Sequence, residues 1–466
     1  MVIKRRFATP PDHEVTMPAL ISHAVDWMNR LLWNGPLLIL LCATHLLFTI
    51  RLGFPQKHTL RAIRLSVEPE GGDQSSKNLS GFGALATTLA ATLGTGNIVG
   101  VSTAIAAGGP GALFWCWITG ILGMATAYAE CFLSVHFRHR LRDGSFTGGP
   151  MYVLEKGLHS KRLGKLYALC TLLAAFGVGC TTQSCAIADA TSTLWKIPPA
   201  VTGLAVALTA GAVILGGIRS ISRFCTKIVP LMGVLYIGAC LILLYLNRAY
   251  LLRALGLILE TAFSPKAVSG GFLGGSFLAA ARYGIARGLF TNEAGIGTAA
   301  IAAGSARSAD PARQGLISMT AVFWDTVVMC ALTGLVIISN LLRLPASAKG
   351  FSGAGLTGAA FQSFPLGGNT FLTLILIAFA VTTLIGWCYL GEKGAEYLFP
   401  AGGTRLYHLA YIFMIYVGAI LPMEYVWSVT DLINGIMVLP NVLALWCLKS
   451  LVAAPFTSLS PLRTNL

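Results

Sequence analysis

Long apolar runs, separated by short polar connections, recur along almost the whole chain. A helix needs about 20 apolar residues to span the hydrocarbon core of a bilayer. The pattern predicts eleven such helices, at approximately 31–50, 80–108, 111–136, 165–188, 198–217, 225–247, 268–290, 315–340, 369–390, 405–422 and 425–448. Residues 1–30 are more polar and weakly amphipathic, which predicts an interfacial segment and no cleaved signal peptide. The sequence therefore predicts an all-α polytopic membrane protein.

The first predicted span stands apart from the other ten. A basic connection at 51–79 follows it, and the remaining spans divide into two sets of five, at 80–247 and 268–448. With an odd number of spans per set, the second set runs through the membrane in the opposite direction to the first. We therefore predict two inverted five-helix repeats, preceded by an additional helix at 31–50 and followed by a cytoplasmic tail at 449–466.

Glycines interrupt the first span of each set, at "LGTGN" (93–97) and at "SGGFLGGS" (269–276). Paired Gly-interrupted segments in inverted halves are the best sequence indication of a transporter's binding site. Close helix packing is the alternative interpretation, because Gly96 and Gly100 have the small-xxx-small spacing. The Thr and Asn within "GTGN" favour a site, since they supply oxygen ligands while glycine permits unwinding.

A break in a membrane helix exposes backbone groups that lipid cannot satisfy. The half-helix after the break presents N–H groups, which suit a carboxylate, and the half-helix before it presents carbonyls, which suit a cation. The N–H groups of Thr95, Gly96 and Asn97 are therefore candidate carboxylate donors. The carbonyls near Ala90 and Leu93 are candidate cation ligands.

Polar side chains in other spans are candidates to complete the site. The hydroxyls of Thr382 and Thr383 could bind the cation, and the neutral amide of Gln183 can bind either end of an amino acid. Bonds of the threonines to their own helix, and an interhelical bond of Gln183, are the alternatives. Asp325 is the candidate for proton coupling. A salt bridge to the basic end of its helix is the simpler interpretation of Glu130.

The segment "RGLFTNEAGIGTAA" at 287–300 is too polar to face lipid. Its position after the seventh predicted span indicates a cytoplasmic cap that helps to close an inner gate. Neither this segment nor "TGGPMYVLEKG" at 147–157 contains a nucleophile paired with a base, a phosphate loop or a metal-ligand cluster. The 11 cysteines are scattered, as is typical of small buried apolar residues. No enzyme site is predicted.

Composition and charge support the membrane prediction. Of the 466 residues, 55% are hydrophobic and 11% are charged, which is too little charge for a soluble domain of this size. The net charge of +15 could indicate nucleic acid, but its distribution indicates a bilayer. If the spans alternate, one set of connections carries 23 of the 33 Lys and Arg residues. The positive-inside rule then places the N-terminus outside the cell membrane and the C-terminus in the cytoplasm.

Several strings together resemble the alanine or glycine:cation symporter family, also called the sodium:alanine symporters. They are "TLGTGNIVGVSTAIAAGGPGALFWCW", "GMATAYAE", "GGPMYVLEKGL", "RGLFTNEAGIG", "RQGLISMTAVFWDT" and "TLIGWCYLGEKGAEYLF", in family order between about residues 33 and 448. The resemblance implies a leucine-transporter-like fold. It also implies sodium-coupled uptake, with protons used by some relatives, of small neutral amino acids such as alanine and glycine.

The resemblance also implies roles for individual residues. The implied substrate contacts are Thr95, Gly96, Asn97, Gln183, Gly274, Gly275, Ser276 and Trp387. The implied sodium ligands are Ala90, Leu93, Thr382 and Thr383. Members of the family tend to read Gly-Asn-x-x-Gln-x-Asn around the glutamine, whereas this chain has Cys180 and Cys185 at the two asparagine places. This departure leaves the substrate and its stereochemistry open.

The leading hypothesis is alternating-access symport of Na+ with a small neutral amino acid. A proton-coupled symporter is the alternative. A passive channel is less favoured, because the spans show no ring of like charges and no repeated carbonyl filter. We expect no cofactor apart from the coupling ion, no nucleic-acid partner and no obligatory protein partner.

Overall fold

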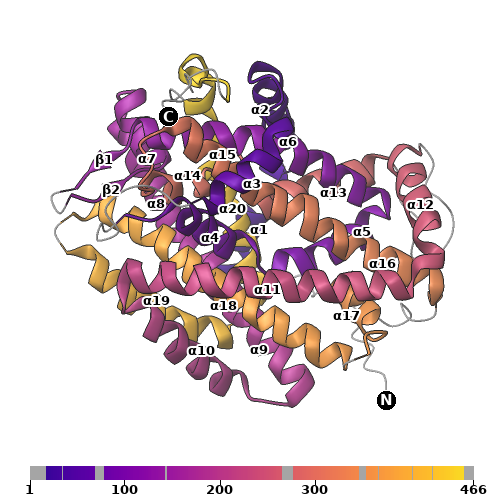
Figure 1. Cartoon of the computed structure of the whole chain (residues 1–466). Helices are drawn as coiled ribbons and strands as arrows, with labels where there is room; N and C mark the ends of the chain where they lie inside the picture. Colours follow the sequence, from indigo (N-terminus) through magenta and orange to yellow (C-terminus); the bar gives the residue numbers. More distant parts are fainter. Residues whose placement is uncertain are drawn as a thin grey trace.

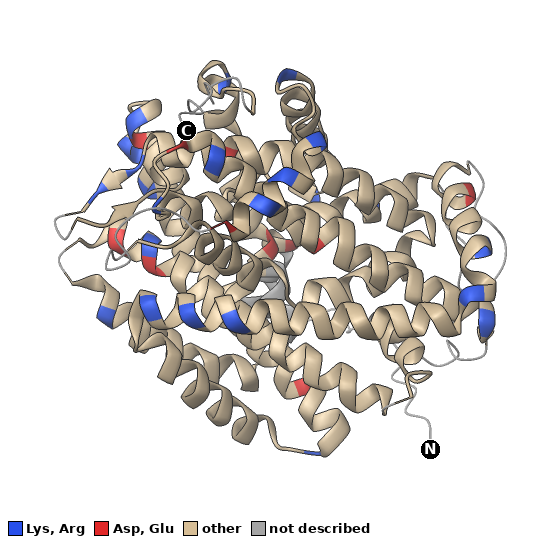
Figure 2. Cartoon of the chain, in the orientation of Figure 1, with Lys and Arg blue, Asp and Glu red and all other residues tan. Residues whose placement is uncertain are grey.

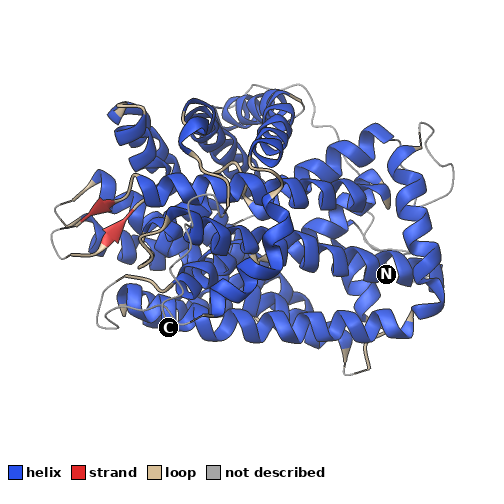
Figure 3. Cartoon of the chain, turned by 45° about the horizontal axis from the view of Figure 1, so that its top comes forward, coloured by secondary structure: helices blue, strands red, loops and turns tan. Residues whose placement is uncertain are grey.

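Helices make up nearly all of the described chain, as Figure 3 shows. The computed structural model describes residues 17–33, 35–68, 78–141, 144–264, 277–345, 353–365, 367–400, 402–421 and 423–455. Within these ranges the strands are β1 (His139–Arg140) and β2 (Phe146–Thr147), which pair in a short antiparallel hairpin. The all-α class predicted from the apolar pattern is confirmed.

Each predicted span coincides with a helix or with two consecutive helices. They are α2 (Pro36–Arg51), α4 (Gly81–Thr92) with α5 (Val101–Gly108), α6 (Gly111–His136), α8 (Lys161–Ala174) with α9 (Thr182–Trp195), α10 (Pro199–Ile214), α11 (Gly217–Leu246), α13 (Phe277–Asn292), α15 (Pro311–Val322) with α16 (Ala331–Arg343), α18 (Gly368–Leu398), α19 (Gly403–Ile420) and α20 (Met423–Cys447). Seven helical stretches of the described chain are long and apolar enough to cross a membrane, and the bent pair α4–α5 makes an eighth.

The other helices precede, connect or follow these spans. They are α1 (Met17–Trp33), η1 (Pro55–His58), α3 (Thr59–Val67), α7 (Pro150–Tyr152), η3 (Val153–Gly157), η5 (Arg248–Tyr250), α12 (Leu251–Phe263), α14 (Thr298–Gly304), η9 (Gly353–Gly355), α17 (Leu356–Phe361) and η10 (Lys449–Leu451). The apolar pattern does not predict α12, because its apolar run is too short for a span. In Figure 1, α12 lies across the right-hand ends of the long helices, and the β1–β2 hairpin lies at their left-hand end.

Two long helices organise the interior. The central helix α6 packs along both α13 and α15, and α18 packs against α4, α8 and α9. Helix α5, the second half of the opening span of the first predicted repeat, packs on α13, which opens the second, so the two opening spans lie against each other. The five-and-five division itself remains a prediction.

The outer face of α11 is apolar. Leu231, Val234, Leu235, Leu241 and Ile242 are all exposed along this one helix. A continuous apolar strip of this kind is rare on a soluble surface and indicates contact with lipid. The exposure pattern therefore agrees with a helix at the edge of a membrane bundle.

Three of the spans contain π-helical turns, η2 (Gly96–Gly100), η4 (Ala175–Thr181) and η7 (Phe323–Cys330). A π turn departs from the regular α-helical hydrogen-bond pattern and is frequent at functional sites. The η2 turn contacts η7, and η4 contacts α18. The irregular backbone of these spans is therefore gathered inside the bundle.

Candidate functional site

The first break lies where the sequence predicts it. Helix α4 ends at Thr92, and its axis is bent by 53° from that of the helical segment 96–108. The Gly94 N–H donates to Asn97 Oδ1 at 3.1 Å, and the Asn97 N–H donates to the Gly94 carbonyl at 3.3 Å. Asn97 Nδ2 donates in turn to Asp325 Oδ1 at 2.7 Å. Asn97 therefore forms hydrogen bonds within the break and links the break to η7 through Asp325.

Asn97 lies apart from the other two predicted carboxylate donors, and its own role as a donor stays a prediction. Its side chain is fully buried, its backbone N–H is already bonded within the break, and it does not line the cavity described below. Asn97 supports the shape of the break, and the candidate carboxylate donors that line the cavity are the N–H groups of Thr95 and Gly96.

A second break separates α13 from α14. Glu293, Gly295 and Gly297 all have positive φ angles there, of 55°, 95° and 94°. Lipid could not satisfy the backbone groups that such a break releases, so other protein groups must bond to them. The Gly295 N–H donates to Glu130 Oε1 at 2.8 Å, and the Gly295 carbonyl accepts from Asn441 Nδ2 at 2.9 Å. Side chains from α6 and α20 therefore hold this break open.

Two predictions about this region need correction. The polar segment at 287–300, predicted to be a cytoplasmic cap, includes the second break itself, because α13 continues through Asn292 to the irregular turn. Glu130, predicted to form a salt bridge, instead accepts from Gly295 and from Asn441 Nδ2, the latter at 2.6 Å. The predicted second break at Gly274, Gly275 and Ser276 lies outside the described residues.

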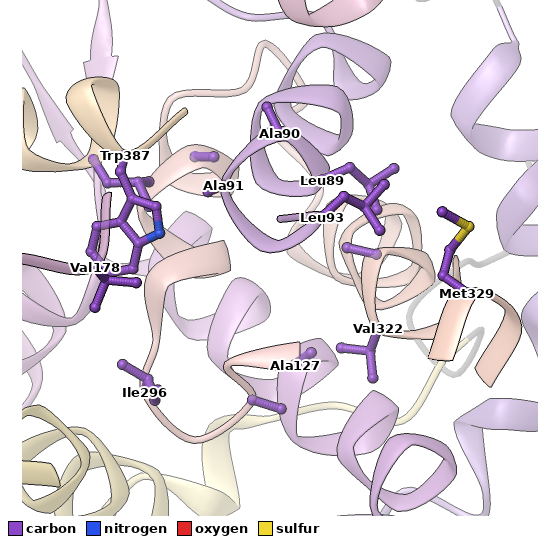
Figure 4. Packing of buried hydrophobic residues seen from close by; sticks show 14 of the residues in the cluster. Leu89, Ala90, Ala91, Leu93, Ala127, Val178, Ile296, Val322, Met329 and Trp387 are labelled. Carbon is purple, nitrogen blue, oxygen red and sulfur yellow. The ribbon is translucent and has the colours of Figure 1, made fainter. Parts of the chain in front are cut away.

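A small cavity of about 30 Å³ lies between the two breaks. Its lining residues are Ala91, Thr92, Gly94, Thr95, Gly96, Val178, Thr182, Gln183, Arg287, Phe290, Thr291, Glu293, Thr383 and Thr430. Figure 4 shows the helical turn through Leu89–Leu93 that leads into the first break, with Val178 and Trp387 together on one flank. The predicted residues Thr95, Gly96, Gln183 and Thr383 are thus brought to one place.

Gln183 presents a free acceptor to this cavity. Its Nε2 donates to the Val178 carbonyl at 3.2 Å, and its Oε1 is buried without a hydrogen-bond partner among the described residues. A Cβ added to Gly94 would lie 3.6 Å from that oxygen. Gln183 Oε1 therefore faces the first break and is available to a ligand.

An arginine and a glutamate also line the cavity, and the sequence pattern does not predict a place there for either of them. Arg287 donates from Nε to Thr291 Oγ1 at 3.0 Å, and its Nη2 has no hydrogen-bond partner among the described residues. Glu293 accepts from Thr298 Oγ1 at 2.5 Å. Both side chains come from the segment "RGLFTNEAGIG", and the polarity of this segment is the sequence feature that indicates them. In the structure, polar side chains of this segment line the cavity.

The glycines of the first break make room for Arg287. A Cβ on Gly96 would lie 2.5 Å from Arg287 Nη2, and a Cβ on Gly100 would lie 1.9 Å from its Cζ. Both distances are far inside van der Waals contact. The spacing of Gly96 and Gly100 therefore accommodates a charged side chain, which is more specific than general helix packing.

The candidate cation ligands divide into two groups. Thr383 Oγ1 donates to the Leu93 carbonyl at 3.1 Å, so these two groups meet at the end of α4. Gly386 lets α18 approach closely, since an added Cβ would lie 3.0 Å from the carbonyl carbon of Ala90. Thr382 faces elsewhere, because its hydroxyl donates to the Phe379 carbonyl at 2.8 Å and also contacts Met232. Thr382 as a sodium ligand stays a prediction, and the site proposed below is built on Thr383.

Asp325 and Trp387 lie behind the cavity and do not line it. Asp325 is fully buried and accepts from Asn97 Nδ2 and from Thr326 Oγ1, the latter at 2.7 Å. Its role in proton coupling stays a prediction. Trp387 packs through its Cβ against Gly179, and its indole lies near the Glu293 carboxyl. Trp387 therefore lies next to Glu293, which lines the cavity, and does not line the cavity itself.

A model described as the sodium:alanine symporter family matches residues 18–460. The chain belongs to the sodium:alanine symporter family. It is 42% identical over 446 residues to the sodium/alanine symporter AgcS of Methanococcus maripaludis, covering 95% of this chain and 98% of AgcS. It is 43% identical over 437 residues to an uncharacterized transporter of Haemophilus influenzae, covering 93% of this chain and 94% of that protein.

A solved structure supports the fold of this family member. The chain resembles MhsT in complex with L-phenylalanine, with a TM-score of 0.57 and 16% identity over 81% of this chain and 90% of that chain. The likeness confirms the leucine-transporter-like fold. Membership of a transporter family also confirms that the chain is not an enzyme.

The two cysteines that depart from the family's asparagine pattern face away from the symporter's cavity. Cys180 Sγ lies 3.5 Å from the Tyr411 carbonyl, and Cys185 Sγ lies 3.4 Å from the Leu421 carbonyl. Both carbonyls belong to α19 or to the residue that follows it. The substitutions therefore alter the contact between η4–α9 and α19, and neither thiol lines the cavity.

Proposed function

We propose that this sodium:alanine symporter carries a small neutral amino acid, such as alanine or glycine, together with Na+ by alternating access. The observation that carries the proposal is a cavity between two helix breaks whose wall holds the guanidinium of Arg287 and the carboxyl of Glu293. A guanidinium and a carboxyl group on one small wall suit a zwitterion, because the guanidinium can pair with its carboxylate and the carboxyl oxygens can accept charge-assisted hydrogen bonds from its ammonium group. The name of AgcS, a sodium/alanine symporter, supports the same substrate class here.

The lining residues suggest how the amino acid lies. Its carboxylate would meet the N–H groups of Thr95 and Gly96 together with Arg287. Its ammonium group would meet Glu293 and the free Oε1 of Gln183. The cavity is small, about 30 Å³, so a short side chain demands the least enlargement. Alanine and glycine are the amino acids that fit this condition best.

The same break supplies the proposed sodium site. The Leu93 carbonyl and the Thr383 hydroxyl are 3.1 Å apart, and the Ala90 carbonyl is in the preceding turn. Hard cations prefer oxygen ligands of this kind. Because ion and amino acid would order one unwound segment, binding of either would favour binding of the other.

The charge distribution supports an orientation in the cell membrane. Figure 2 shows many Lys and Arg residues towards the left-hand end, around the β1–β2 hairpin and the start of α11, and a smaller group on α12. By the positive-inside rule the hairpin end would face the cytoplasm, with the N-terminus outside and the C-terminus inside.

Reconstituted transport tests the proposal. Uptake of labelled alanine and glycine into proteoliposomes is measured with an inward Na+ gradient, with an inward proton gradient, and with neither. We expect the Na+ gradient alone to drive accumulation. Uptake at the same rate with either gradient and with neither would exclude symport. Uptake driven only by protons would exclude the sodium assignment and direct attention to Asp325.

A matched pair of variants tests the site. Gln183→Leu should reduce uptake strongly, because it removes the free acceptor from the cavity. Cys185→Ser, two positions along the same helix, should leave uptake near the wild-type rate, since its side chain faces Leu421. Equal effects of the two substitutions would contradict the proposed position of the substrate.

A further inference from the structure

Three elements meet at Gly123 in the middle of α6. A Cβ added to Gly123 would lie 3.5 Å from His45 Nε2 of the additional helix α2 and 3.5 Å from Asn292 Nδ2 at the second break. The methyl group of Ala294 borders the same point, at 3.4 Å. The absent side chain of Gly123 thus leaves a space that two nitrogen atoms face.

Both nitrogen atoms are buried without a hydrogen-bond partner among the described residues. His45 is 1% exposed and Asn292 is 3% exposed. The other polar atom of each side chain is already bonded, His45 Nδ1 with Thr126 Oγ1 at 2.8 Å and Asn292 Oδ1 with the Ala294 N–H at 3.0 Å. These bonds fix both side chains, so the unsatisfied nitrogens stay directed at the space. Buried polar atoms of this kind are normally bonded, to protein or to ordered water.

A second contact joins the same two elements. Leu41 lies four residues before His45, so both side chains are on one face of α2. A Cβ added to Gly295 would lie 2.2 Å from Leu41 Cδ2, so only a glycine lets Leu41 seat against the break. Helix α2 therefore touches the second break at Gly295, and its His45 faces the same point as Asn292.

We propose that the additional helix α2 positions the second break, through Leu41 seated on Gly295 and through a water molecule bound between His45 Nε2 and Asn292 Nδ2. The Nδ1–H of neutral His45 would donate to Thr126, its Nε2 would accept from the water, and the water would accept from Asn292. One water with two or more polar partners meets the usual requirement for a buried site.

This arrangement links α2 to the transported amino acid. Glu293 follows Asn292 directly and lines the cavity. A shift of Asn292 moves the backbone of Glu293, and with it the carboxyl that would bind the ammonium group. The inference therefore rests on the proposed function for its effect on transport, but the bound water itself does not depend on it.

Gly123→Ala distinguishes a bound water from an empty space. The new methyl group would fit at ordinary contact distance, so in an empty space the substitution should stabilise the helix and raise the Tm. If a water is bound there, the methyl group displaces it, and we expect a lower Tm and an alanine KM raised about fivefold, as for the loss of one hydrogen bond. Gly233→Ala on α11, where no atom lies near the added Cβ, is the control and should change neither quantity for the worse.

Substitutions of His45 test the bridge from the other side. His45→Gln keeps a polar group and should retain an alanine KM within about twofold of wild type, whereas His45→Leu should raise it about fivefold. Thr44→Val is the control in α2, because Thr44 bonds to Leu40 and Trp446 and does not face the break. If His45→Leu and His45→Gln give the same KM, or Gly123→Ala raises the Tm and leaves the KM unchanged, the proposal is wrong.

The experiments distinguish a failure of the proposed function from a failure of the proposed role of α2. Should the wild-type protein take up neither alanine nor glycine, the proposed function fails, and the Tm values of Gly123→Ala and Gly233→Ala still decide whether a water is bound. If the wild-type protein transports alanine while the Gly123 and His45 variants behave like their controls, the proposed role of α2 is wrong and the proposed function stands.

Discussion

The neighbouring threonines of α18 offer the sharpest test of the ion site, because the structure gives them different partners. Thr383 Oγ1 faces the Leu93 carbonyl at 3.1 Å, whereas Thr382 Oγ1 donates to the Phe379 carbonyl at 2.8 Å. Both hydroxyls are buried, with exposures of 2% and 0%. Thr383→Ala and Thr382→Ala therefore remove the same atoms from adjacent positions, and only the first removes a proposed sodium ligand.

The expected magnitude follows from what each hydroxyl contacts. Removing a hydrogen bond to a neutral group costs about 1 kcal/mol of stability, while an interaction with a charged partner contributes about 1.5–3 kcal/mol. At 1.4 kcal/mol per tenfold change in affinity, Thr383→Ala should raise the Na+ concentration for half-maximal uptake roughly 10- to 100-fold. Thr382→Ala should lose stability to a similar extent as Thr383→Ala and leave Na+ activation unchanged.

The assay is the initial rate of alanine uptake into proteoliposomes as a function of external Na+, with the Tm of each purified variant measured in parallel. The reasoning is refuted if Thr383→Ala keeps the wild-type Na+ dependence, or if Thr382→Ala shifts that dependence equally. A parallel fall in Tm for both variants, without a selective change in Na+ activation, would assign Thr383 to packing alone.

Three further substitutions test other parts of the site. Gly100→Ala places a methyl group against Arg287 and should cost about 1–3 kcal/mol by overpacking, measured as a lower Tm together with a higher alanine KM; an unchanged Tm would contradict the close contact. Glu293→Gln should raise the alanine KM about tenfold or more, because it replaces an oxygen that would accept from the ammonium group with an NH2 group that cannot, and an unaltered KM in uptake assays would remove Glu293 from the substrate site. Asp325→Asn keeps an acceptor for Asn97 and should preserve Na+-driven uptake; loss of only the proton-driven component would assign Asp325 to proton coupling.

The first break is readable from the sequence because its determinants are local. Gly94, Gly96 and Gly100 occur within one turn or two of Thr95, and glycine in an apolar span is a strong indication of unwinding or close approach. The sequence alone does not show why each glycine is needed. Gly100 gives room to Arg287, which is 187 positions away in the chain.

The break between α13 and α14 is not predicted from the sequence, because its stabilising groups are distant along the chain. The backbone of Gly295 is held by Glu130 on α6 and by Asn441 on α20. When those distant partners are not known, the polar segment around Glu293 is typical of a loop at a membrane surface. The local pattern shows that the segment is polar, but it cannot distinguish a buried unwound segment from an exposed one.

The distinction between Thr382 and Thr383 is also a tertiary one. Adjacent residues point about 100° apart around an α-helix, so only one of the pair can face a given neighbour. The rotation of α18 is set by its packing on α4, where Gly386 meets the backbone of Ala90. Pattern predicts that hydroxyls are present in the span, and packing decides which one reaches the break.

The measurement that tests the central claim most directly is the reciprocal linkage of the two ligands at the first break. The Kd for alanine is determined by equilibrium binding to the purified protein without Na+ and at saturating Na+, and the Kd for Na+ is determined without alanine and at saturating alanine. If one unwound segment binds both, each ligand lowers the Kd of the other by the same factor, expected to be about 5- to 150-fold. Alanine binding that is independent of Na+ would show that the break does not couple the two ligands.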